Sequence, residues 1–175
     1  MDSLEQLAIL LRQYNAIGRE IATLICRPAQ IGHAGEYIAS QIFDIRLEHA
    51  ANARAIDGCF ASGPLGGCSA NIKWYAMHEN ILDVCTGVQP DCYLVMTGPA
   101  SSSLTSRGGQ RPWLLHSVFL FSSLQLLQEL GQRGVKVGVA TSVRKATWEA
   151  AMIYPRNSNA YVLTELQRQQ LALFT

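Results

Sequence analysis

An acid, an amide and an amine in the middle of the sequence are spaced so that they could hold a divalent cation and stabilise negative charge. Asn71 and Lys73 flank Ile72 in a segment typical of a β-strand, so their side chains share one face of that strand. Residues 62–67 form a strong turn signal, and a hairpin about this turn places Asp57 opposite Asn71 or Ile72. A register slip of one residue would separate the groups, so both alternatives stay open. Carboxylate and amide oxygens are ligands that Mg²⁺ accepts, which points to metal-assisted chemistry.

The spacing of these residues resembles a known nuclease motif. Asp57 followed by residues 71–73 (Asn-Ile-Lys) is similar to the Asp…(Asp/Glu)-X-Lys core of the PD-(D/E)XK nuclease-like superfamily. In that superfamily the core lies on a β-hairpin, preceded by a helix that often contributes a glutamate, and Glu36 occupies the corresponding place. The apolar segment 92–96 matches the third core strand. The resemblance covers residues 31–97 well and the rest in outline, and it implies hydrolysis of DNA phosphodiester bonds.

The resemblance also implies a role for each residue. Mg²⁺ or Mn²⁺ would be held by Asp57, the side-chain oxygen of Asn71, the backbone carbonyl of Ile72 and Glu36, directly or through water. Lys73 would orient the attacking water and stabilise the developing negative charge. Asn71 departs from the family pattern, which has Asp or Glu at this position. The site therefore carries one negative charge fewer, and we expect weaker metal binding.

Ordinary structural alternatives exist for three of these residues. Glu36 also fits a solvated carboxylate on a helix, and Asp57 before Gly58 also fits a turn residue. Lys73 could lay its aliphatic stem along the sheet and keep its charge in water.

Two groups of basic residues are candidate nucleic-acid contacts. Arg107 and Arg111 lie in segment 98–112, which is rich in Gly, Ser and Pro and is expected to form a mobile loop. Arg144 and Lys145 form the second group, close to a tryptophan. The net charge of the chain is only +1, so any contact with DNA must come from such local groups.

Other catalytic patterns are weak or absent. Ser142 and Lys145 fit the Ser-X-X-Lys spacing of serine acyl-transfer enzymes, but no Ser-Asp-Asn or Lys-Thr-Gly accompanies them. The sequence has no P-loop and no Gly-X-Gly-X-X-Gly dinucleotide fingerprint. Its four histidines are scattered, which favours structural or surface roles.

The positions of apolar and turn-forming residues predict helices and strands in alternation. Gly32 and Gly35, near the start of the second predicted helix, would permit close approach of another backbone. Helices are expected over residues 4–25, 31–46, 124–131 and 164–174, and strands over 53–57, 70–75, 92–96, 118–121 and 135–139. This order predicts an α/β fold, with a mixed β-sheet flanked by helices, of the restriction-endonuclease-like type.

Length and composition indicate one domain, residues 1–175. Charged residues make up only 15%, and a homodimer interface would account for the shortage. The five cysteines lack the two-residue gap of zinc or redox motifs; Cys59 and Cys68 could face each other across a hairpin, but small reduced core residues are the favoured interpretation. No apolar run is long enough for a membrane span, and the N-terminus lacks the features of a signal peptide, so a cytoplasmic location is expected.

Three functional hypotheses follow from these patterns. The first is a metal-dependent nuclease acting on DNA. The second is a nuclease-like binding or interaction module with weak or no catalysis, motivated by Asn71 and the low content of charged residues. The third is an unrelated α/β enzyme that uses segment 98–112 as a lid, for which a large apolar pocket distant from Asp57 would be the supporting observation.

Overall fold

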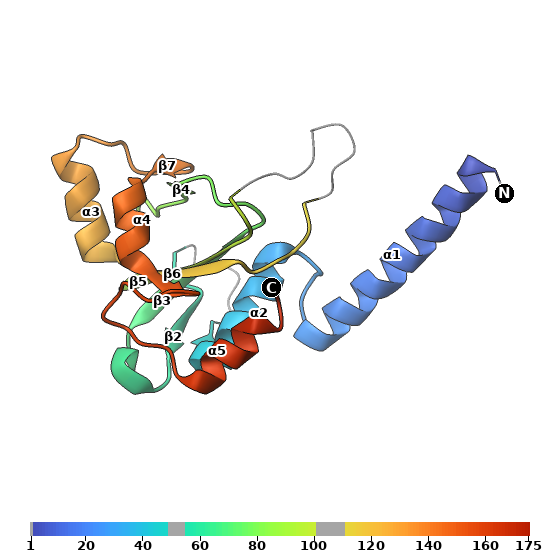
Figure 1. Cartoon of the computed structure of the whole chain (residues 1–175), viewed down its shortest axis with the longest axis horizontal. Coiled ribbons are helices and arrows are strands. Elements are labelled where there is room, and N and C mark those ends of the chain that lie inside the picture. The colour runs from blue at the N-terminus through green and yellow to red at the C-terminus, as the bar shows by residue number, and fades with distance from the viewer. Residues whose placement is uncertain (1, 49–54, 101–110) are drawn as a thin grey trace.

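The computed structural model describes residues 2–48, 55–100 and 111–175, in which helices lie on both faces of a mixed sheet (Figure 1). The helices are α1 (Ser3–Ile25), α2 (Ile31–Phe43), α3 (Ser123–Gln132), α4 (Lys145–Ala151) and α5 (Glu165–Ala172), with one 3-10 turn, η1 (Gly63–Leu65). The strands are β1 (Ile45–Leu47), β2 (Gly58–Phe60), β3 (Ser69–Tyr75), β4 (Ile81–Leu82), β5 (Cys92–Thr97), β6 (Ser117–Ser122), β7 (Thr141–Ser142) and β8 (Met152–Tyr154).

The main sheet is mixed, as expected from the sequence. Its six strands follow the order β1-β2-β3-β5-β6-β8, and β4 pairs with β7 in a separate two-stranded sheet. Neighbouring strands of the main sheet are antiparallel, except that β3 and β5 run parallel. All six residues of β5 are buried, which confirms the prediction of a buried central strand from its continuous apolar run.

Side-chain alternation along the strands separates two apolar clusters. On β5, Leu94 and Met96 pack in the first cluster, whereas Tyr93 and Val95 pack in the second. Helices α2 and α5 contribute to the first cluster, and α3 and α4 contribute to the second. Figure 1 shows α3 and α4 together at the left end of the molecule, and α2 and α5 together at the lower centre, between the sheet and α1.

One of the two glycines of α2 brings this helix directly onto β3. A Cβ atom added at Gly35 would lie 2.9 Å from the Cβ atom of Trp74, so only glycine fits at this contact. At Gly32, no atom of the described residues lies within 4 Å of such a Cβ. The close approach expected from the sequence is therefore confirmed at Gly35 and wrong at Gly32.

Several predicted boundaries are wrong for identifiable reasons. The second helix ends at Phe43 rather than near residue 46, because Asp44 adopts a left-handed conformation (φ 53°) as C-cap and the chain enters β1. The strand expected over 53–57 starts instead at Gly58, and residues 53 and 54 lie outside the described part. Residues 135–139 form no strand and lie in the connection between α3 and β7.

The cysteines are free in this structure. Cys59 pairs in the sheet with Ser69 rather than facing Cys68. Cys92 is buried, but Cys26 is exposed, so the prediction of core cysteines is wrong at that position. None of the described helices is both long enough and apolar enough to cross a membrane.

Candidate functional site

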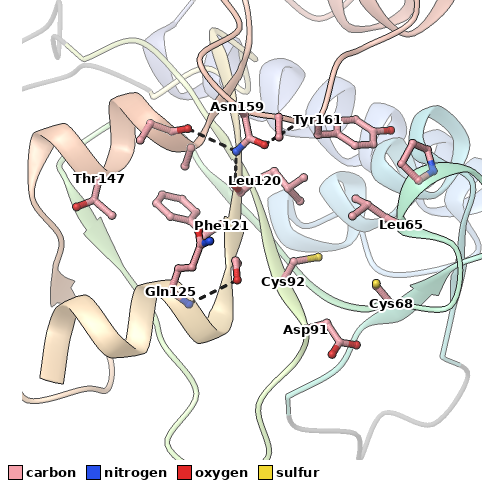
Figure 2. Close-up of a pocket in the computed structure, with 15 residues that line it drawn as sticks. Leu65, Cys68, Asp91, Cys92, Leu120, Phe121, Gln125, Thr147, Asn159 and Tyr161 are labelled. Atoms are coloured by element: carbon pink, nitrogen blue, oxygen red, sulfur yellow. Dashed lines mark hydrogen bonds between the residues drawn. The ribbon is translucent and has the colours of Figure 1, made fainter.

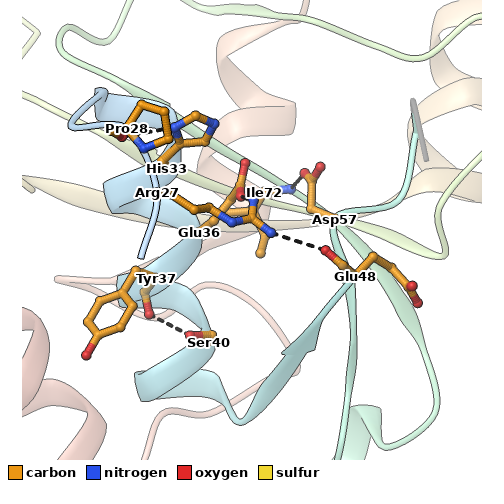
Figure 3. Close-up of polar contacts among 9 residues, drawn as sticks. All are labelled: Arg27, Pro28, His33, Glu36, Tyr37, Ser40, Glu48, Asp57 and Ile72. Carbon is orange, nitrogen blue, oxygen red and sulfur yellow. Dashed lines mark hydrogen bonds and ion pairs between the residues drawn. The ribbon is translucent and has the colours of Figure 1, made fainter. Parts of the chain in front are cut away.

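Asp57 is the residue immediately before β2, and it lies beside the part of β3 that β2 does not cover. The last sheet pair joins Gly58 to Ala70, and the Asp57 backbone N–H donates to the Ala70 carbonyl at 2.9 Å. The Asp57 carboxylate then accepts the backbone N–H of Ile72 at 2.6 Å (Figure 3). The register expected from the turn therefore brings Asp57 to the predicted segment of β3. The Asp57 carboxylate therefore satisfies the Ile72 N–H, which would have bonded to the backbone of β2 if that strand were longer.

Asn71 lies next to this contact and is 2% exposed. Its Nδ2 donates to the Ala55 carbonyl at 3.1 Å. Its Oδ1 is buried and has no hydrogen-bond partner in the described residues. A buried acceptor without a donor costs free energy, which ligation of a cation or a water would offset.

Lys73 shares the Asn71 face of β3. Ile72 and Trp74 pack in the first apolar cluster and Tyr75 packs against the second, which confirms the alternation predicted from the sequence. Lys73 is half-buried on this strand. Tyr75 serves the scaffold instead, because its hydroxyl accepts the backbone N–H of Asp83 at 3.0 Å.

Glu36 reaches the same region from α2. Burial and the neighbouring Asp57 raise its pKa, and together they outweigh the opposite effects of Arg27, His33 and Lys73. The carboxylates of Glu36 and Asp57 and the ammonium of Lys73 therefore lie within the range of electrostatic interaction. These three predicted residues lie in one neighbourhood but not on one side of the sheet, because α2 packs on the face of β3 that bears Ile72 and Trp74, whereas Lys73 lies on the other face.

Arg27 is a member of this neighbourhood that the sequence analysis missed. Its guanidinium forms an ion pair with Glu36 and donates to the Glu48 carbonyl at 3.1 Å (Figure 3). The Glu36 side chain is only 16% exposed in this pair. Arg27 is nine residues from Glu36 and separated from it by Pro28, so no helical or strand spacing indicates the contact. The one sequence feature that marks Arg27 is its position as a single basic residue between two predicted helices.

The oxygen atoms at this edge are of the kind that hold Mg²⁺ or Mn²⁺. In the described residues no three His, Cys, Asp or Glu side chains gather as a metal site. The predicted ligand set contains only two acids, Asp57 and Glu36. The side-chain oxygen of Asn71 and the carbonyl oxygen of Ile72 supply its other ligands. The unpartnered Oδ1 of Asn71 fits that role, since a hard cation accepts a neutral oxygen.

The predicted nucleic-acid contacts are not gathered in one patch. Arg107 lies outside the described residues. Arg111 lines a cavity beside β3, described below. Arg144 lies 3.9 Å from Glu129, and Lys145 lies 3.6 Å from an acid one turn along α4. These nearby acids offset part of the positive charge at α4.

The cavity beside Arg111 has a volume of about 380 Å³ and surrounds the end of β3. Its lining includes His78, Thr97 and Trp148, and each of them has a buried polar atom without a hydrogen-bond partner in the described residues. Burial lowers the pKa of His78, and its Nε2 lies 3.1 Å from the Asn80 side-chain oxygen. Three polar atoms without partners therefore lie in a mainly apolar lining, and the lowered pKa favours the neutral form of the His78 imidazole.

A second cavity, of about 500 Å³, lies where β5 begins and β6 ends (Figure 2). Asp91 is the one charged side chain in its described lining, and it accepts the N–H and the hydroxyl of Ser69, both at 2.7 Å. These bonds lower the pKa of Asp91. Burial, with smaller effects of Cys68 and Asp91, raises the pKa of Cys92 to about 12, so this thiol is a poor nucleophile.

Comparison with known proteins assigns the chain to no family. The chain matches no protein-family model, and no curated protein sequence matches it significantly.

Proposed function

We propose that the chain is a metal-dependent nuclease that hydrolyses DNA phosphodiester bonds on a restriction-endonuclease-like scaffold. The observation that carries the proposal is the contact of Asp57 with the Ile72 N–H at the open edge of β3. It aligns the predicted acid with the segment that contains Asn71 and Lys73. The antiparallel strands β1, β2 and β3, preceded by a helix that bears Glu36, support the same scaffold.

In this proposal each residue has a separate task. Asp57, Glu36, the Asn71 Oδ1 and the Ile72 carbonyl would hold Mg²⁺ or Mn²⁺. When bound, such an ion offsets charge on the scissile phosphate and lowers the pKa of a bound water. The Lys73 ammonium would orient the attacking water and stabilise negative charge that develops on the phosphate.

Contact with DNA would depend on Arg111 and on Arg144 and Lys145. Arg144, the N-cap of α4, and Lys145, its first residue, are well exposed, with side-chain exposures of 63% and 80%. Their pairing with acids and the small net charge of the chain favour weak, salt-sensitive binding.

A second candidate function is a nuclease-like interaction module without catalysis. The specific observation in its favour is the Arg27–Glu36 ion pair, which places a guanidinium beside one of the predicted metal ligands. Asn71 favours the same alternative, because it removes one negative charge from the site.

The decisive experiment is cleavage of plasmid and single-stranded DNA with Mg²⁺ or Mn²⁺. We expect Lys73→Ala to lower the cleavage rate by about 100-fold or more, as the loss of a charge-stabilising donor does in other enzymes. Lys136→Ala is the matched control, because Lys136 is exposed in the loop after α3. Cleavage that persists unchanged in Lys73→Ala would remove the proposed mechanism.

A further inference from the structure

The cavity of about 380 Å³ lies at the carboxyl ends of the parallel strands β3 and β5, whose last residues, Tyr75 and Thr97, both line it. Just beyond these ends the two chain segments touch. A Cβ atom added at Gly98 would lie 2.1 Å from the Ala76 carbonyl oxygen, so only glycine fits there. In open α/β sheets, ligands bind outside the carboxyl ends of parallel strands. The volume also falls within the range of small-molecule pockets, about 300–1,000 Å³.

Buried polar atoms without hydrogen-bond partners are concentrated at this cavity. Six such side-chain atoms occur in the described residues, and three of them, Thr97 Oγ1, Trp148 Nε1 and His78 Nδ1, belong to its lining. Thr97 is 1% exposed and Trp148 is 2% exposed. The larger cavity of about 500 Å³ has no such atom in its described lining. Because an unpaired buried polar atom costs free energy, this wall favours a ligand with polar atoms of its own.

The inner wall of the cavity carries a donor and an acceptor on neighbouring rings. The indole N–H of Trp148 can only donate. The Nε2 atom of His78 lies 3.1 Å from the Asn80 side-chain oxygen, which can only accept, so Nε2 carries the proton. Burial lowers the pKa of His78, which favours the neutral ring and leaves Nδ1 as an acceptor. The His78 ring stacks on Phe119 and meets the edge of Trp148, with centroids 5.3 Å and 4.7 Å apart.

The outer wall of the cavity is aromatic. All three tryptophans of the chain line the cavity. The rings of Trp74 and Trp113 have centroids 6.3 Å apart and are tilted by 58°. Trp113 is 40% exposed, so part of its ring surface is open to a ligand. Planar heterocycles, nucleobases among them, stack on such rings.

The charged side chains in the described lining are Arg111 and Glu79. A guanidinium binds phosphate through two parallel hydrogen bonds. A carboxylate only accepts hydrogen bonds, so Glu79 suits the hydroxyls of a sugar and disfavours further phosphate groups. One cation and one acid therefore fit a ligand with a single phosphate beside a polyhydroxylated part.

We propose that this cavity binds a nucleoside monophosphate. The base stacks on Trp113 and turns its polar edge toward His78 and Trp148, since every nucleobase carries a donor beside an acceptor on that edge. Arg111 binds the phosphate, and Glu79 accepts from the sugar hydroxyls. The inference is separate from the proposed nuclease activity, with which it shares only Arg111, and it requires no divalent metal.

Tryptophan fluorescence of the full chain, in buffer without divalent metal, tests the proposal. AMP, GMP, CMP and UMP are titrated in turn. Because all three tryptophans line the cavity, we expect saturable quenching with a Kd of about 1 mM or tighter for at least one of them. Inorganic phosphate is the control, since it can reach Arg111 but cannot stack, and it should not quench. Absence of saturable quenching by all four nucleotides would overturn the proposal.

Calorimetry with the nucleotide that quenches best and with its nucleoside tests the phosphate contact. We expect Arg111→Gln to raise the Kd of the nucleotide by about 10-fold or more and to leave the Kd of the nucleoside unchanged, because only the nucleotide loses a charged hydrogen bond. Arg156→Gln is the matched control, since Arg156 is exposed and lines a different cavity. Equal effects of the two substitutions on nucleotide binding would contradict the assignment of the phosphate to Arg111.

Two further substitutions test the base contacts. Trp113→Ala should raise the Kd by about 10-fold or more through loss of stacking, and Leu114→Ala is its control, since Leu114 is similarly exposed (38%) and is not among the lining residues. His78→Phe keeps a ring against Phe119 but removes the acceptor, so it should also weaken binding. If the Kd is unchanged in both Trp113→Ala and His78→Phe, the base does not bind in this cavity and the proposal is wrong.

Discussion

The two polar atoms of the Asn71 amide have different surroundings. Nδ2 donates to the Ala55 carbonyl, whereas Oδ1 is buried without a partner in the described residues. A carboxylate at this position would lose the bond to Ala55 and gain a charge that requires a cation. The position therefore tests the metal site directly.

We predict that Asn71→Asp lowers stability by about 1–3 kcal/mol without metal, because the Ala55 carbonyl loses its donor. Mn²⁺ should then raise the Tm of this variant more than that of the wild type, since the second acid strengthens the site. Thermal unfolding with and without Mn²⁺ measures both effects.

Asn159→Asp is the control for this variant. Asn159 also donates from Nδ2 to a backbone carbonyl, that of Leu120 at 3.0 Å, and lies outside the candidate site. An equal Mn²⁺ response in the two variants would count against metal binding at Asn71 and would favour the non-catalytic module.

Glu36 gives the second prediction at the residue scale. Its pKa is raised in the folded state by burial and by Asp57, so folding favours its protonated form. The stability that this group contributes is fully present below its ordinary pKa of 4.5 and is lost as pH rises through the raised value. Glu36→Gln keeps an acceptor for Arg27 but cannot ionise.

We therefore expect the wild type to lose stability relative to Glu36→Gln as pH rises from about 4 to 7. Urea unfolding of both proteins across this range gives the difference in the free energy of unfolding. If the stability of the wild type instead increased relative to Glu36→Gln as pH rises, the ion pair with Arg27 would outweigh the effect of burial on Glu36.

At this scale the sequence predicts contacts within one hairpin better than contacts between helices. Asp57 meets the Asn71 segment because residues 62–67 form the predicted turn, which restricts the register to a few choices. Arg27 meets Glu36 because of the direction in which the chain leaves α1. That direction depends on tertiary packing, which no local pattern encodes.

Helix α5 shows how an element is fixed by its ends and one buried side chain. Thr164 caps it by accepting the backbone N–H of Gln167 at 3.2 Å. Leu171 is fully buried in the first apolar cluster, whereas Leu173 is 78% exposed. The side chain of Gln167 also donates to the Ile42 carbonyl, which joins α5 to the end of α2.

We predict that Leu171→Ala destabilises the fold by about 2–5 kcal/mol, because it leaves a cavity beneath α5. Leu173→Ala removes the same atoms from the surface and should change stability by less than about 0.5 kcal/mol. Chemical denaturation of the two variants makes the comparison. Equal losses would mean that α5 does not close the first cluster.

Elements with one long, periodic signal were predictable, and short ones were not. The apolar run of β5 and the helical spacing of α1 and α3 gave correct elements. The three-residue strands β1, β2 and β8 are too short to carry a period of their own, so pairing with neighbours determines where they begin and end.

At the scale of the whole molecule, the sequence predicts a mixed sheet between helices but not the order of its strands. The parallel pairing of β3 with β5 depends on the route of residues 76–91 between them, which has no periodic pattern. The sequence predicts that α1 is a helix but not that it is exposed. Helical spacing identifies the apolar face of a helix, and it does not identify what packs against that face.

The position of α5 has a consequence for synthesis of the protein on the ribosome. Residues near the C-terminus close the first cluster: Leu171 is buried in it, and the Leu115 N–H donates to the Phe174 carbonyl at 2.8 Å. A nascent chain therefore leaves part of this apolar surface exposed to water until residues 165–174 emerge from the exit tunnel. The first cluster closes only after these residues are made, and until then the unfinished chain presents a natural target for chaperones.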